Sequence, residues 1–163
     1  PTCWRFFSPT NKILLAVDDS AGSRGGIRLA AMMSKAENAP GLILHVIPYR
    51  SGSPFPALAG VANMPMSQDK DVSEAAEKLV QEFKDELEKQ GVSCSTKLKD
   101  GNPAEMIINT AKEENCDFIV MGGRGAGSFS SLLLGSISHK VLQLSCLPVL
   151  ISRPCGNTKE CAL

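Results

Sequence analysis

Residues 102–121 read NPAEMIINTAKEENCDFIVM and join a helix signal to a strand signal. Asn102 can cap a helix, Pro103 suits its first position, and Glu105 stands where a capping box has a carboxylate. Apolar residues then recur at i, i+3, i+4 and i+7, from Ala104 to Ala111, which predicts one buried helical stripe. Residues 118–121 form a continuous apolar run, as strands covered on both faces do.

The same alternation extends over most of the chain. Further strands are expected at residues 13–17, 42–47, 92–98 and 149–151. Residues 92–98 alternate between apolar and polar, which is typical of a strand near a sheet edge. A long helix with one apolar face from Val72 to Leu87 precedes Gly91. Another helix opens near Gly135, with Ile137, Val141 and Leu144 on one face. This order predicts an α/β fold with an open five-stranded parallel sheet and helices on both faces.

Length and composition limit the possible classes of protein. A chain of 163 residues favours one domain, which we place at residues 11–153 between loose termini at 1–10 and 154–163. Seventeen basic residues balance seventeen acidic ones without a basic cluster, so nucleic acid is not an expected partner. No apolar run approaches the roughly 20 residues that span a bilayer. Without a signal peptide or a C-x-x-C pair, the expected location is the cytoplasm, with the cysteines of apolar segments buried.

Residues 49–68 interrupt the alternation with three prolines and two glycines. A connection of this length is either a functional lid or a disordered insert, and disorder is the slightly favoured interpretation.

Candidate ligand residues follow the first and fourth strands, because open α/β sheets bind ligands beyond the carboxyl ends of their strands. Asp18 could accept hydrogen bonds from a ribose or a base, or it could help to cap the next helix, and the two interpretations weigh equally. As a surface-facing carboxylate it is not expected to matter for the fold. The segment GGRGAGS (122–128) and the helix start GSIS (135–138) could together hold a polyphosphate through backbone N–H groups and hydroxyls. Each segment alone is better explained by flexibility or capping.

Taken together, Gly122, Gly125 and Gly135-Ser136 have the spacing G-x2-G-x9-G-[ST]. This spacing resembles the signature of nucleotide-binding universal stress proteins, over roughly residues 11–153. The resemblance implies a Rossmann-like sheet of order 3-2-1-4-5, a homodimer formed through Val149-Leu150-Ile151, and ATP or AMP as ligand, with or without Mg²⁺. By position it assigns the nucleotide contacts to Ala16, Val17, Asp18, Val46, Met121, Gly122, Arg124, Gly125, Gly135, Ser136, Ile137 and Ser138. Gly123 departs from the family, which often has serine there, and Arg124 is either a phosphate partner or a solvated side chain.

Catalytic signals are sparse. His45 falls in a buried strand, where a satisfied core histidine is the usual role, and His139 is expected to face outward; neither belongs to a nucleophile or metal constellation. No catalytic or metal-binding residue is predicted. The favoured function is a nucleotide-binding stress-response or signalling module. The alternatives are a slow ATPase and a nucleotide-free dimeric interaction module.

Overall fold

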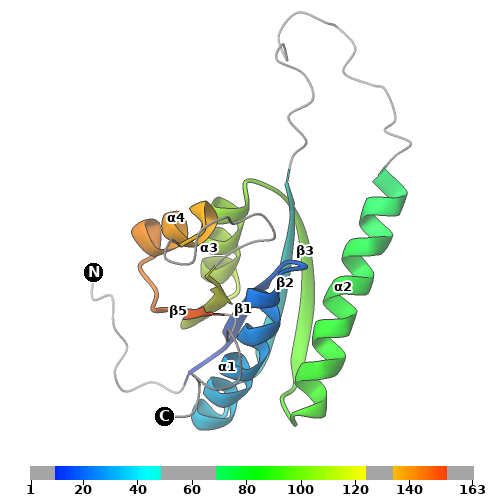
Figure 1. The fold of residues 1–163 in the computed structure, drawn as a ribbon. Helices are drawn as coiled ribbons and strands as arrows, with labels where there is room; N and C mark the ends of the chain where they lie inside the picture. The colour runs from blue at the N-terminus through cyan, green and yellow to red at the C-terminus, as the bar shows by residue number, and fades with distance from the viewer. Residues whose placement is uncertain (1–9, 49–68, 124–133, 154–163) are drawn as a thin grey trace, which may run out of the picture.

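A computed structural model describes residues 10–48, 69–123 and 134–153. In this part of the chain the strands are β1 (Ile13–Val17), β2 (Gly41–Pro48), β3 (Cys94–Gly101), β4 (Phe118–Gly122) and β5 (Val149–Ser152). The helices are α1 (Ala21–Glu37), α2 (Asp69–Lys89), α3 (Pro103–Glu113) and α4 (Ser136–Leu144). All strand pairs are parallel and the sheet order is β3-β2-β1-β4-β5, which confirms the predicted fold class (Figure 1).

Two helical layers enclose the sheet. Side chains of β1 alternate between them, because successive residues of a strand point to opposite faces. Ile13 and Leu15 pack in one core with residues of α1 and α2, whereas Leu14 and Ala16 pack in the other with residues of α3 and α4. Helices α1 and α2 thus cover one face and α3 and α4 the other, as Figure 1 shows. This arrangement leaves the carboxyl ends of β1, β2 and β4 between the two layers.

The helix ends follow the predicted local chemistry. Asn102 caps α3 by accepting a hydrogen bond from the backbone N–H of Glu105, at 3.5 Å, and Pro103 occupies the first helical position. Gly91 follows α2 with φ of +80°, a conformation that glycine adopts at little cost. Gly135 is the N-cap of α4.

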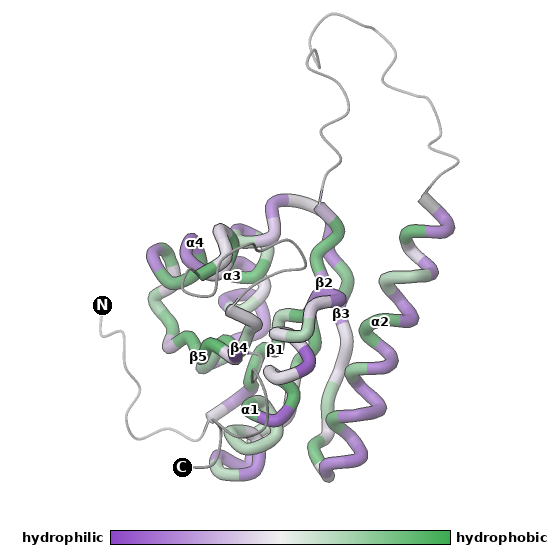
Figure 2. Tube along the Cα trace, in the orientation of Figure 1, coloured by the Kyte–Doolittle hydropathy of each residue, from purple (hydrophilic) through white to green (hydrophobic). Residues whose placement is uncertain are grey.

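Several sequence predictions need correction. In α2 the apolar face is buried from Ala76 to Leu87, but Val72 is exposed; Figure 2 shows the alternation of hydrophobic and hydrophilic segments along this helix. The face of α4 that carries Ile137, Val141 and Leu144 is buried only at Val141, and Leu144 is 54% exposed. Cys146 is exposed, not buried, because it lies in the short turn between α4 and β5. The lid or insert at 49–68 lies outside the described residues.

No helix in the described ranges is both long and apolar enough to cross a membrane.

Candidate functional site

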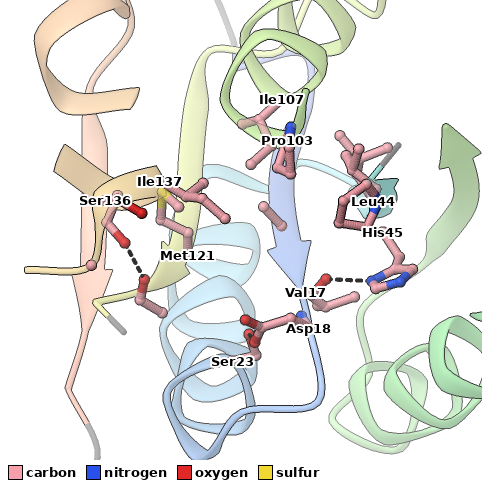
Figure 3. A pocket seen from close by; sticks show the side chains of 16 residues that line it. Val17, Asp18, Ser23, Leu44, His45, Pro103, Ile107, Met121, Ser136 and Ile137 are labelled. Carbon is pink, nitrogen blue, oxygen red and sulfur yellow. Dashed lines mark hydrogen bonds between the residues drawn. The ribbon is translucent and has the colours of Figure 1, made fainter. Parts of the chain in front are cut away.

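A pocket of about 350 Å³ opens at the carboxyl ends of β1, β2 and β4 (Figure 3). It lies at the point where the chain leaves β1 for β2 on one side and, later, returns to β4 on the other. Such a reversal of strand order is where open α/β sheets bind their ligands. The volume falls at the lower end of the range of small-molecule sites, about 300–1,000 Å³.

The pocket gathers ten of the twelve residues that the sequence predicted for a ligand. These are Ala16, Val17, Asp18, Val46, Met121, Gly122, Gly135, Ser136, Ile137 and Ser138. The other two, Arg124 and Gly125, lie outside the described residues. The structure therefore brings Asp18 and the helix start at Gly135, more than 100 positions apart in the sequence, to one cavity. Their contact with a nucleotide stays a prediction.

Asp18 is held against the first turn of α1. Its Oδ1 accepts hydrogen bonds from the hydroxyls of Ser20 and Ser23 and from the backbone N–H of Ser20. Ser20 is the N-cap of α1 and accepts from the backbone N–H of Ser23 at 3.2 Å. Asp18 thus supports the start of α1, in keeping with the capping interpretation. It also lines the pocket, which the ligand-binding interpretation requires. Within the described residues, its Oδ2 has no hydrogen-bond partner and is available to a ligand.

The amino-terminal end of α4 forms the opposite side of the pocket. The first hydrogen bond of this helix runs from the N–H of His139 to the carbonyl of Gly135, at 2.9 Å. The N–H groups of residues 136–138 therefore have no partner within the described residues and point out of the helix end, where the helix dipole favours an anion. Ser136 is exposed and carries a hydroxyl at the same place.

Ser138 has a different environment from Ser136. It is buried, and its hydroxyl donates to the carbonyl of Gly122 at 2.9 Å, which ties α4 to the end of β4. The backbone continues the same connection, because the N–H of Gly135 donates to the carbonyl of Gly123 at 2.8 Å. The N–H of Gly123 donates to the carbonyl of Ser152, so it is not available to an anion. At this point the glycine-rich segment serves the fold as well as the pocket.

Six lining residues were not predicted from the sequence: Ser23, Leu44, His45, Pro48, Pro103 and Ile107. Ile107 was recognised as part of a core stripe, and it both packs in the core and reaches the cavity. His45 was expected to be a satisfied histidine of a buried strand, and its Nδ1 does lie 2.8 Å from the carbonyl oxygen of Val17. In the sequence, these residues could have been found only from their position near the end of a strand or helix that borders the predicted site.

The chemistry of the cavity is divided between its walls. Aliphatic side chains, Leu44, Val46, Ile107 and Met121 among them, line one part. Polar groups lie at Asp18 and Ser23, at His45 and at the start of α4. The pocket therefore suits a molecule with a flat apolar portion, a hydrogen-bond donor and an anionic group.

A family model described as the universal stress protein family matches residues 9–153. The chain belongs to the universal stress protein family. YxiE of Bacillus subtilis, a universal stress protein, is 35% identical over 147 residues, which span 88% of this chain and 99% of that one.

Solved structures show the same fold as this universal stress protein. MJ0577 of Methanocaldococcus jannaschii superimposes with a TM-score of 0.77 at 25% identity, over 92% of this chain and all of that one. A universal stress protein of Archaeoglobus fulgidus in complex with dAMP superimposes with a TM-score of 0.65 at 22% identity, over 89% and 99%.

Groups of three or more histidine, cysteine or acidic side chains that could hold a metal ion are absent from the described ranges of this universal stress protein.

Proposed function

We propose that this universal stress protein binds an adenine nucleotide, ATP or AMP, in the pocket and acts as a stress-response or signalling module. The observation that carries the proposal is that Asp18 and the open amino-terminal end of α4 face one cavity across its apolar wall. An adenine nucleotide has the three matching portions, namely a flat base, a ribose with hydroxyl donors and a charged phosphate.

Each portion has a matching wall. The apolar wall around Val46, Ile107 and Met121 would take the base, and the Oδ2 of Asp18 would accept from a ribose hydroxyl. The N–H groups of residues 136–138 and the hydroxyl of Ser136 would donate to phosphate oxygens. Arg124 and Gly125 belong to the same proposal through the spacing of the signature. Mg²⁺ would enter with ATP, since this ion commonly reaches proteins through nucleotide phosphates.

The complex of the Archaeoglobus fulgidus relative with dAMP supports the ligand class. The cytoplasm is the location that we propose for this module.

Mass spectrometry of the denatured, purified protein tests the proposal. We expect ATP or AMP to be released from the wild type and to be absent from Gly135→Val, in which a branched side chain stands at the start of α4. A wild type that releases no nucleotide, and that gives no heat on titration with ATP or AMP, would contradict the proposal.

We also propose a homodimer that forms through β5. This strand is the edge of the sheet, and its apolar residues Val149, Leu150 and Ile151 are only partly buried. Leu142 and Leu144 of the neighbouring α4 add exposed apolar surface. An edge of this kind is normally covered, and a second copy would cover it symmetrically. At a protein concentration of roughly tens of micromolar, where ordinary dimers are assembled, light scattering should give twice the mass of the chain. The mass of a monomer would contradict the proposed homodimer.

A further inference from the structure

One peptide group next to the pocket is held by side chains from two different elements. It is the peptide bond that joins Val17 to Asp18. Its carbonyl oxygen lies 2.8 Å from the Nδ1 of His45 on β2, and its N–H donates to the Oγ of Ser23 on α1 at 3.0 Å (Figure 3).

We propose that His45 and Ser23 are positioning residues that set the orientation of Asp18 for ligand binding. The inference rests on the proposed function, since it concerns how the same carboxylate meets the nucleotide. Neither residue needs to touch the ligand for this role. Both act through the peptide plane from which the side chain of Asp18 departs.

The geometry explains why two anchors are needed. A peptide group is planar, so fixing its carbonyl and its N–H fixes the direction in which the next residue leaves the strand. Ser23 adds a third constraint, because its hydroxyl also donates to the Oδ1 of Asp18. One carboxylate oxygen, Oδ1, is thereby occupied by the protein, whereas Oδ2 has no hydrogen-bond partner within the described residues. A site whose groups are held in place before binding loses less freedom on binding.

The hydrogen bond also defines the state of the imidazole. A carbonyl oxygen only accepts, so the Nδ1 of His45 must carry the proton. In the neutral ring the Nε2 is then unprotonated.

A matched pair of variants tests the role of His45. In His45→Asn the amide nitrogen stands where the Nδ1 of histidine stands and can still donate, whereas His45→Leu keeps bulk without a donor. By calorimetry, we expect His45→Leu to weaken adenosine and ATP binding about fivefold, which corresponds to the loss of one hydrogen bond. His45→Asn should stay close to the wild type. Ser23→Ala should weaken both ligands in the same way as His45→Leu.

A double-mutant comparison separates positioning from general stabilisation. If His45 acts through Asp18, His45→Leu should cost nothing further in an Asp18→Ala background. Equal weakening by His45→Leu and His45→Asn, or effects that multiply with those of Asp18→Ala, would overturn the inference and leave the proposed function intact. A wild type that binds no nucleotide would instead overturn the proposed function, and the positioning role with it.

Nuclear magnetic resonance tests the anchors without a ligand. Long-range proton–nitrogen spectra should show the Nδ1–H tautomer of neutral His45, and amide exchange at Asp18 should accelerate in Ser23→Ala. The opposite tautomer, or unchanged exchange at Asp18, would overturn the inference even if the variants proved too unstable for calorimetry.

Discussion

Gly122, at the end of β4, lies so close to Ser23, in the first turn of α1, that a Cβ at position 122 would stand 2.8 Å from the backbone nitrogen of Ser23. The obstacle is backbone, which cannot turn aside as a side chain can. Ser23 holds Asp18, and Gly122 accepts the hydrogen bond from Ser138. The contact between Gly122 and Ser23 therefore joins the two polar sides of the pocket. Packing requires a glycine at position 122, independently of any role of the following loop in ligand binding.

Gly122→Ala should lower the stability and weaken ligand binding together. The added methyl must displace the first turn of α1, at a cost of about 1–3 kcal/mol for an overpacked site. Denaturant unfolding measures the first effect and calorimetry with ATP the second.

Gly26→Ala is the matched control for Gly122→Ala. It adds the same methyl to α1, but its nearest neighbour is the end of the Leu15 side chain at 3.0 Å, and alanine favours the helix. A Gly122→Ala protein as stable as Gly26→Ala would contradict the role assigned to the contact.

Asp18→Ala should weaken adenosine and ATP by about tenfold or more, because a hydrogen bond to a charged group contributes about 1.5–3 kcal/mol. It should also lower the stability by about 1 kcal/mol, because the hydrogen bonds that the Oδ1 of Asp18 accepts from Ser20 and Ser23 are lost. The sequence predicted that this change would leave the fold intact, and that stays a prediction; the hydrogen bonds from Ser20 and Ser23 add to it a modest loss of stability. Calorimetry and thermal unfolding measure the two effects.

Asp19→Ala is the control for Asp18→Ala, since the side chain of Asp19 is 84% exposed and makes one 3.7 Å ion pair with Arg24. Asp19→Ala should change neither the ligand affinity nor the stability much. Similar losses in both variants would show that the effect comes from net charge and not from the carboxylate of Asp18.

Ser136→Ala and Ser138→Ala should differ in which ligand they affect. Ser136 is exposed at the helix end, so its loss should weaken ATP more than adenosine, which has no phosphate. Loss of the Ser138 hydroxyl breaks the bond to the Gly122 carbonyl, so it should lower the thermal midpoint and weaken both ligands alike. Calorimetric titrations with ATP and with adenosine measure the two affinities. If Ser136→Ala weakened the binding of both ligands equally, Ser136 would be a structural group and not a phosphate ligand.

Glu114 should give the stability a pH dependence below neutrality that is independent of the pocket. Hydrogen bonds from Lys12, at 2.6 Å, and from Lys97 lower the pKa of the Glu114 carboxyl to about 2. A lowered pKa means that the contribution is complete above the ordinary value of 4.5 and is lost as the pH falls toward about 2. Urea unfolding at pH 5 and pH 3 should therefore show a smaller difference for Glu114→Gln than for the wild type.

Glu113→Gln is the control for Glu114→Gln, because Glu113 is more exposed and meets Lys99 at 3.5 Å. It should keep the wild-type dependence on pH. If Glu114→Gln retained the full dependence, the two-lysine contact would not be its source.

The strands, the parallel α/β class and one half of the site could be predicted because their signals are local, whereas the order of the strands was implied by the family resemblance alone. Apolar runs define the strands, and the spacing of Gly122, Gly125 and Gly135 identifies the loop and helix start by family resemblance. Such patterns depend on neighbours in the sequence, which are visible without a structure.

The remaining lining residues depend on contacts that the sequence does not display. His45 reaches Val17 because the two are register partners across β1 and β2. Ser23 reads as an ordinary residue of a helix start, and only the turn of α1 brings it back to Asp18. The exposure of Leu144 could not be predicted either, because the helical period does not show how far the rest of the protein covers a helix face. Cys146 is exposed because it lies in the turn between α4 and β5.

Titration of the isotopically labelled, nucleotide-free protein with ATP, followed in proton–nitrogen correlation spectra, tests the central claim most directly. We expect shifts of the amides of Asp18, Val46 and residues 136–138 that saturate together, with adenosine reproducing the shifts at Asp18 and Val46 but not those at 136–138. An absence of saturable shifts, or shifts confined to residues outside the pocket, would contradict the claim that this cavity binds an adenine nucleotide.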